Sequence, residues 1–106
     1  MRQFSARELN DHLQESDHPP QLLDVREEWE FDYCHIEHSV LIPMGEIHTR
    51  LDELDPKREV VVICHHGIRS GQVGRFLEYQ GFENVINLKG GVEDWATQVD
   101  SHMPRY

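Results

Sequence analysis

The sequence has little cysteine, few basic residues and no long hydrophobic run. Its 106 residues include two cysteines, Cys34 and Cys64, which excludes a disulfide framework, and their spacing is not that of a zinc site. Ten basic residues against twenty acidic ones give a formal net charge of −10, which argues against nucleic acid or an anionic membrane as the main partner. No apolar run approaches the ~20 residues that a membrane helix needs.

The first residues of the sequence do not have the pattern of a secretory signal peptide. Met1 to Ser5 contain one arginine and no hydrophobic region behind it. We therefore expect a single soluble domain over residues 1–106, cytoplasmic, with both thiols reduced. The eight histidines form no pair at metal-ligand spacing on a convincing helix, and six of them are scattered among polar residues. We expect surface histidines there, and neither a metal nor a cofactor.

The most informative stretch runs from residue 59 to residue 71. Four consecutive β-branched residues, Val60 to Ile63, predict a strand buried on both faces, and Cys64 follows directly. A short loop with Gly67 and Arg69 then leads into a helical pattern that begins at Ser70. Free backbone amides and the positive end of a helix dipole would favour a thiolate on Cys64. A cysteine often merely ends a buried strand, but these neighbours together favour a loop that holds an anion or a reactive sulfur.

Short apolar segments alternate with helical patterns along the rest of the chain. Strands are expected at 21–25, 39–42, 60–63 and 83–88, and helices from Ser5, over 28–31 with the aromatic side chains inward, over 46–54, over 70–80 and from 92, before an irregular tail at 100–106. This alternation requires crossover connections, hence a mainly parallel sheet covered on both faces. Ligands bind beyond the carboxyl ends of such strands, where Asp24 and Cys64 lie.

Three motifs, in order, resemble the signatures of rhodanese domains. They are Leu22–Glu27 with Glu30-Phe31, His35-Ile36 and Ile42-Pro43; the loop Cys64–Ser70; and Gly81–Val85 with Leu88, Gly90-Gly91 and Trp95. The resemblance covers about Leu22 to Trp95, and Pro104–Tyr106 after Trp95 are similar to rhodanese domains fused to sulfur-carrier-activating enzymes. It implies an α/β, three-layer rhodanese-like domain, with a mainly parallel five-stranded sheet and helices on both faces.

The resemblance also implies a sulfurtransferase with Cys64 as its nucleophile. The thiolate would take the outer sulfur of thiosulfate or of a protein persulfide, and a thiol, an acceptor protein or cyanide would remove it. Backbone N–H groups of the loop would hold the negative outer sulfur, as an oxyanion hole holds oxygen. The residues expected to bind substrate are His65, His66, Gly67, Ile68, Arg69 and Ser70, with Asp24 and Arg26 as structural supports.

Several roles stay open at this point. Arg69 either binds an anionic donor or braces the loop by pairing with a carboxylate such as Asp24 or Glu30. His65 and His66 either assist the thiolate when protonated or only line the mouth of the site. Cys34 is either a solitary buried or loop cysteine or a second thiol able to reach the persulfide.

Two positions depart from the family pattern, which commonly has glycine where this chain has Cys34 and His38. Each must either tolerate a left-handed backbone or change the turn.

Two other functions compete with sulfur transfer. Tyrosine-phosphatase-like enzymes, arsenate reductases and rhodanese-like phosphatases also use cysteine and arginine around an amide cradle, but with one more residue than the four between Cys64 and Arg69. A shorter ring suits one sulfur atom better than a tetrahedral oxyanion. A non-catalytic rhodanese-like binding module is the other alternative, and the presence of Cys64, Gly67 and Arg69 favours catalysis over it.

Overall fold

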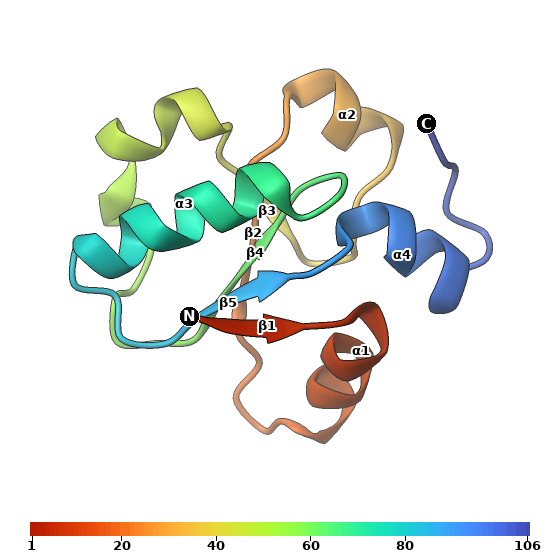
Figure 1. Ribbon diagram of the computed structural model, residues 1–106, viewed down its shortest axis with the longest axis horizontal. Coiled ribbons are helices and arrows are strands. Elements are labelled where there is room, and N and C mark those ends of the chain that lie inside the picture. The colour runs from red at the N-terminus through yellow and green to blue at the C-terminus, as the bar shows by residue number, and fades with distance from the viewer.

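A five-stranded, entirely parallel sheet forms the centre of the structure, a computed structural model of residues 1–106 (Figure 1). Its strands follow the order β1-β5-β4-β2-β3, and every neighbouring pair is parallel. The strands are β1 (Arg2–Phe4), β2 (Gln21–Asp24), β3 (Val40–Leu41), β4 (Val60–Ile63) and β5 (Val85–Leu88). The predicted α/β architecture with a mainly parallel five-stranded sheet is confirmed.

Helices cover both faces of the sheet, as predicted. One face packs against α1 (Ala6–Glu15) and α4 (Gly91–Gln98), and the other against α3 (Ile68–Tyr79) and the 3₁₀ helices η1 (Met44–Thr49) and η2 (Leu51–Glu53). Helix α2 (Glu28–Tyr33) follows β2. Alternate residues of β4 enter the two cores, with Val61 and Ile63 in one and Val60 and Val62 in the other. None of these helices has the length and apolar composition to cross a membrane.

Four local expectations differ from the structure. The edge strand β1 is not among the predicted strands. It has only three residues, two of them polar, which is too few for a periodic hydrophobic pattern. The predicted helix over 46–54 is instead η1 and η2, which Arg50 separates and which have no side-chain caps. Helix α3 begins at Ile68, two residues before the expected start. On α2, Trp29 is 63% exposed, so the expectation of inward aromatic side chains is wrong for this residue.

The backbone conformation differs between the two positions at which this chain lacks the family's glycine. His38 takes a left-handed backbone with φ of 70°, whereas Cys34 is extended with φ of −163°. A left-handed conformation is sterically tolerated by histidine more readily than by β-branched residues. The turn therefore keeps its left-handed residue at His38 and needs none at Cys34.

The register of the strands brings the predicted site residues to one edge. Asp24 at the end of β2 pairs with Ile63 at the end of β4, so the segments that follow both strands leave the sheet side by side. The segment after β5 joins them: the amides of Val92 and Glu93, in the first turn of α4, donate to the carbonyls of Cys64 and His65 at 2.9 and 3.1 Å. The loop after β4 therefore rests on the beginning of α4.

Gly91 makes this contact possible, and replacing it tests the packing of the loop. Its φ is +59°, and a Cβ there would lie 2.3 Å from the carbonyl oxygens of Cys64 and His65. We expect Gly91→Ala to lower the free energy of unfolding in urea by about 2 kcal/mol or more, from clash and backbone strain. Gly45→Ala is the control, because its Cβ would meet nothing within 4 Å. Equal urea midpoints for the two variants would contradict this packing.

Candidate active site

The sulfur of Cys64 lies at the end of β4 under a turn of backbone amides. It accepts hydrogen bonds from the N–H groups of Gly67 at 3.1 Å and Ser70 at 3.3 Å, and the residue is 1% exposed. Gly67 allows the chain to turn back over the sulfur, because its φ of 96° is in the left-handed region. Both amides belong to the predicted cradle. N–H donors directed at the sulfur stabilise negative charge on it.

Asn87 supports this turn from β5. Its side-chain N–H₂ donates to the carbonyl of Gly67 at 3.2 Å and to Gln3 at 2.9 Å, and its oxygen accepts from the hydroxyl of Ser70. That hydroxyl lies 3.3 Å from the sulfur of Cys64. Sequence reasoning missed Asn87. The available signal was an asparagine among the apolar residues of a fully buried strand, where a polar side chain needs partners.

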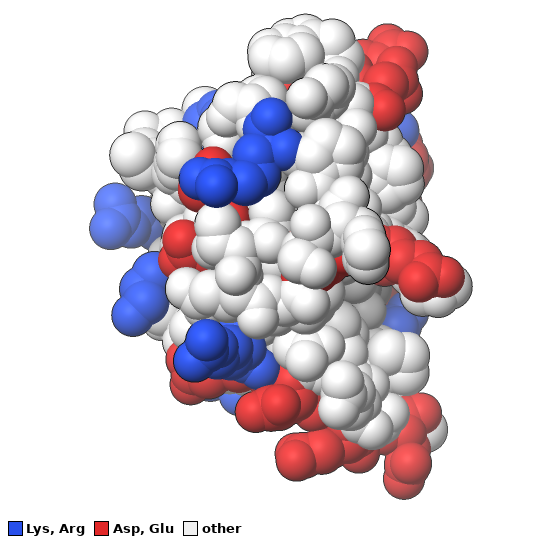
Figure 2. Space-filling model, turned by 90° about the vertical axis from the view of Figure 1, so that its right-hand side faces the viewer, with Lys and Arg blue, Asp and Glu red and all other residues white.

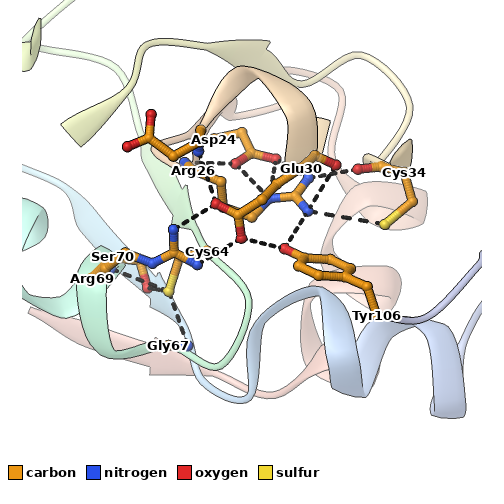
Figure 3. Close-up of polar contacts among 10 residues, drawn as sticks. Asp24, Arg26, Glu30, Cys34, Cys64, Gly67, Arg69, Ser70 and Tyr106 are labelled. Atoms are coloured by element: carbon orange, nitrogen blue, oxygen red, sulfur yellow. Dashed lines mark hydrogen bonds and ion pairs between the residues drawn. The ribbon is translucent and has the colours of Figure 1, made fainter. Parts of the chain in front are cut away.

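Arg69 pairs with a carboxylate in the structure, as the bracing role predicted for it requires. Its guanidinium donates to both carboxylate oxygens of Glu30, at 2.7 and 2.9 Å (Figure 3). Burial raises the pKa of Glu30, but hydrogen bonds from Arg69 and Tyr106 outweigh that effect and lower the pKa to about 2. The same pair raises the pKa of Arg69. Both side chains are therefore charged at neutral pH, and α2 is tied to the first turn of α3.

Asp24 and Arg26 form a second, fully buried ion pair beneath the first. Both are 0% exposed, and the guanidinium of Arg26 reaches the two carboxylate oxygens of Asp24 at 2.7 to 3.1 Å. It also donates to the carbonyl of Cys34 at 2.6 Å and to that of Glu30 at 3.3 Å. Neither residue contacts the sulfur of Cys64, so their place is that of the predicted structural supports.

Tyr106 joins the two ion pairs and was missed by sequence reasoning. Its hydroxyl donates to Glu30 at 2.6 Å and accepts from Arg26 at 2.9 Å (Figure 3). Its ring stacks on that of His65, with centroids 4.0 Å apart. Burial and the neighbouring Glu30 raise the pKa of Tyr106 to about 12, so the phenol stays protonated. The irregular tail around it has no periodic pattern from which this contact could be predicted.

Of the remaining loop side chains, His65 is partly buried, whereas His66 and Ile68 are exposed. The ring of His65 lies between those of Tyr106 and His66, each 4.0 Å away. Burial, and then the proximity of His66, lower the pKa of His65 below 6.5, so its ring is neutral at pH 7. His66 is exposed, and Ile68 is 72% exposed. Cys34 lies in the core with its sulfur 3.9 Å from Arg26, as a solitary buried cysteine.

The ion pair between Glu30 and Arg69 predicts a pH dependence of stability. The pKa of Glu30 is about 2 in the folded state, against 4.5 for a free carboxyl. The resulting stabilisation is complete above pH ~4.5 and is lost as the pH falls toward 2, an effect of about 3 kcal/mol. We expect urea unfolding of Glu30→Gln to show a correspondingly weaker decrease of stability over this range. Glu28→Gln, an exposed carboxyl outside any ion pair, should keep the wild-type profile. Superimposable profiles of the wild type and Glu30→Gln would refute the assignment.

Removing the hydroxyl of Tyr106 tests its link between the ion pairs. Tyr106→Phe keeps a ring to stack on His65 but deprives Arg26 and Glu30 of a buried partner, at a cost of about 1–3 kcal/mol. The acid transition assigned to Glu30 should move to higher pH, because a hydrogen bond that lowers its pKa is lost. Tyr79→Phe, at a residue 88% exposed, is the matched control for urea unfolding. A Tyr106→Phe protein as stable as this control would show that the hydroxyl contributes nothing.

Comparison with known proteins identifies the family. A family model described as "Rhodanese-like domain" matches residues 5–98. The chain is 37% identical over 95 residues to "Putative sulfurtransferase YtwF" of Bacillus subtilis, covering 90% of both chains. It is 41% identical over 86 residues to "Putative sulfur carrier protein YrkF" of the same species, covering 81% of this chain and 46% of that protein.

Solved structures agree with the sequence comparison. A rhodanese-like domain protein from Staphylococcus aureus superposes with a TM-score of 0.84 at 33% identity, covering 90% of this chain and 91% of that one. Relatives named as sulfurtransferases also include "Thiosulfate sulfurtransferase GlpE" of Actinobacillus pleuropneumoniae, 35% identical over 74 residues, which are 70% of this chain and 68% of that protein. With Cys64 under its turn of amides and the family model matched over most of its length, this chain belongs to the rhodanese-like domain family.

Proposed function

We propose that the protein is a sulfurtransferase that moves a sulfane sulfur from a donor to an acceptor through a persulfide on Cys64. The observation that carries this proposal is the placement of the Cys64 sulfur under the amides of Gly67 and Ser70. Membership of the rhodanese-like family and the names of the similar proteins support it.

The first half-reaction loads the cysteine. The Cys64 thiolate attacks the outer sulfur of thiosulfate or of a protein persulfide, and a new S–S bond forms while the donor's S–S bond breaks. The electron pair of the broken bond leaves with sulfite or with the donor thiolate. Negative charge on the transferred sulfur is stabilised by N–H groups of the loop from His65 to Ser70.

The second half-reaction returns the enzyme to its starting state. A thiol, an acceptor protein or cyanide attacks the outer sulfur, and Cys64 leaves as a thiolate, so no external oxidant, metal or cofactor is needed. In this scheme Asp24 and Arg26 touch no reacting atom. They act by holding the chain that carries Glu30, which in turn holds Arg69.

Phosphatase or arsenate reductase chemistry is less well supported. Those reactions need the loop arginine to grip the oxygens of a tetrahedral anion, whereas both N–H₂ groups of Arg69 are bonded to Glu30. Cys64 is also 1% exposed, which leaves little room for a bulky group at its sulfur.

Intact mass spectrometry tests the proposed intermediate. After incubation with thiosulfate or a low-molecular-weight persulfide, the wild type should gain the mass of one sulfur atom and lose it again to cyanide. Cys64→Ala should gain none, because the nucleophile is absent, while Cys34→Ala should behave as the wild type.

Other results would overturn the proposal. A Cys64→Ala protein that gains sulfur as readily as the wild type would move the chemistry to Cys34. A wild type that gains sulfur from no donor, including a persulfide-loaded cysteine desulfurase, would remove the activity altogether. Hydrolysis of an aryl phosphate that depends on Cys64 would favour the phosphatase alternative.

A further inference from the structure

A polar hollow lies beside the cysteine loop, between α3 and the strands β5 and β1. It has a volume of about 340 Å³, which is within the range of small-molecule sites. Its polar lining comes from the start of α3 and from the two strands: Gln3, Gly67, Gly71, Gln72, Arg75 and Asn87. Cys64 is not part of this lining, and the proposed sulfur transfer does not use the hollow.

Arg75 gives the hollow a positive charge that no carboxylate neutralises. Its guanidinium is exposed and forms no ion pair, in contrast to that of Arg69, and no acidic side chain lines the hollow. Lys89, also exposed and outside any ion pair, has its Cα 3.5 Å from the place that a Cβ of Gly67 would take. Figure 2, a view onto the edge toward which the strands point, shows Lys and Arg groups at its left margin that stand apart from the acidic ones. Although the whole chain has a formal net charge of −10, an anion is therefore attracted to this hollow.

Gly71 keeps the hollow open at a cost to the helix. It lies inside α3, where glycine is less favourable than alanine because of its backbone freedom. Packing does not require a glycine there, since a Cβ would meet only the side-chain amide of Asn87, at an ordinary 3.7 Å. Gly74 of the same helix differs, because a Cβ there would collide with the side chain of Met1. A large side chain at Gly71 would occupy the hollow, so the glycine preserves space for a ligand.

The chemistry of the lining fits a small organic carboxylate. Arginine binds a carboxylate through two parallel N–H···O bonds, which makes Arg75 the anchor for the charged group. The N–H₂ groups of Gln3 and Gln72 are free to donate to a polar remainder, because Gln3 uses only its oxygen, toward Asn87. Ile68 at the rim offers an apolar contact. The hollow is larger than an inorganic ion needs, so an organic acid fills it better than phosphate does.

Residues of the same hollow hold the turn over Cys64. Gly67 donates its N–H to the sulfur at 3.1 Å, and its carbonyl accepts from the side chain of Asn87 at 3.2 Å. Cys64 is 1% exposed, so a reagent reaches the sulfur only when this turn opens. A ligand that binds between α3 and β5 while the turn is closed lowers the population of the open form.

We propose that this hollow binds a small organic carboxylate through Arg75, and that the bound ligand holds the turn over Cys64 closed. Both parts go beyond sulfur transfer and neither depends on it, because ligand binding and opening of the turn can be measured without a sulfur donor. Arg75 contacts the carboxylate of the ligand and touches no reacting atom.

A nuclear magnetic resonance titration with succinate tests the site. In ¹H–¹⁵N spectra of the wild type we expect saturable shifts of the backbone amides of Gly67 and Gly71 and of the side-chain amides of Gln3 and Asn87. Succinamide has the same carbon skeleton without the charges and should bind at least about tenfold more weakly, because it lacks the carboxylate that Arg75 holds. Inorganic phosphate is charged but has no carbon skeleton, and it should also bind more weakly than succinate.

Two variants and a matched control separate this site from unspecific attraction. Arg75→Gln should weaken succinate binding about tenfold or more, because a charge-assisted pair is lost. Gly71→Leu should abolish saturable binding, because a helical side chain leans toward the preceding turn and would fill the hollow beside Gly67. Arg7→Gln removes the same charge from an exposed arginine of α1 that forms no ion pair, and it should keep the wild-type affinity.

Urea unfolding of Gly71→Ala tests the reason for the glycine. This variant should be at least as stable as the wild type, because its Cβ has room and alanine is the better helix former. A clear loss of stability would show that packing requires the glycine, and would overturn its assignment to the hollow.

Alkylation of Cys64 by iodoacetamide, followed by peptide mapping, tests the effect on the turn. With succinate at ten times its dissociation constant, the rate in the wild type should fall about tenfold, because the population of the open turn falls by that factor. At the same succinate concentration the rate in Arg75→Gln should fall by no more than about twofold. This difference distinguishes binding in the hollow from competition at the cysteine itself.

Each part of the proposal can be overturned separately. Shifts that do not saturate, or an Arg75→Gln protein that binds succinate as tightly as the wild type, would refute the binding site. Equal affinity for succinamide or phosphate would refute the ligand class. An unchanged alkylation rate in wild type saturated with succinate would refute the effect on the turn. Sulfur loading of Cys64 is measured without succinate, so it stands or fails independently of these results.

Discussion

The carboxylate of Glu30 is the point on which the active-site edge depends. It accepts two hydrogen bonds from Arg69 and one from Tyr106, and its own backbone carbonyl accepts from Arg26. A buried charge is costly unless it is paired and fully hydrogen-bonded, and no buried side-chain polar atom in this structure lacks a partner. Removing Arg69 leaves the buried charge of Glu30 uncompensated, and removing the hydroxyl of Tyr106 leaves Glu30 and Arg26 without a hydrogen-bond partner. These contacts hold α2, the cysteine loop and the tail in one common geometry.

This arrangement keeps the cysteine loop in place without any contact to the sulfur itself. Arg69 holds the far end of the loop, Tyr106 stacks on His65 at its near end, and N–H groups in the first turn of α4 donate to the loop carbonyls. The amides of Gly67 and Ser70 are thereby directed at Cys64 before any substrate arrives. Amides held in this way stabilise negative charge at the sulfur without having to reorganise.

Much of the fold could be predicted from local patterns. The run Val60 to Ile63 marked the central strand, and the capping box of Ser5 and Glu8 marked the start of α1. Alternation of strands and helices then required a parallel sheet with its site at the carboxyl edge. β1 was not predicted because its three residues form a strand only by pairing with β5, which is distant in the sequence. The exposure of Trp29 depended on how α2 lies against the tail, which no local pattern encodes.

For the site, the sequence by itself determined the cysteine loop, since Cys64, Gly67 and Ser70 are close in the chain and their backbone geometry follows from a strand, a glycine and a helix start. Only the tertiary structure decided the partner of Arg69, because Glu30 is 39 residues away and competed with Asp24 as an equally plausible carboxylate. It alone revealed Asn87 and Tyr106, whose contacts join segments distant in sequence. Local hydrogen bonds can be inferred from spacing, whereas long-range pairing of buried charges depends on how the whole chain packs.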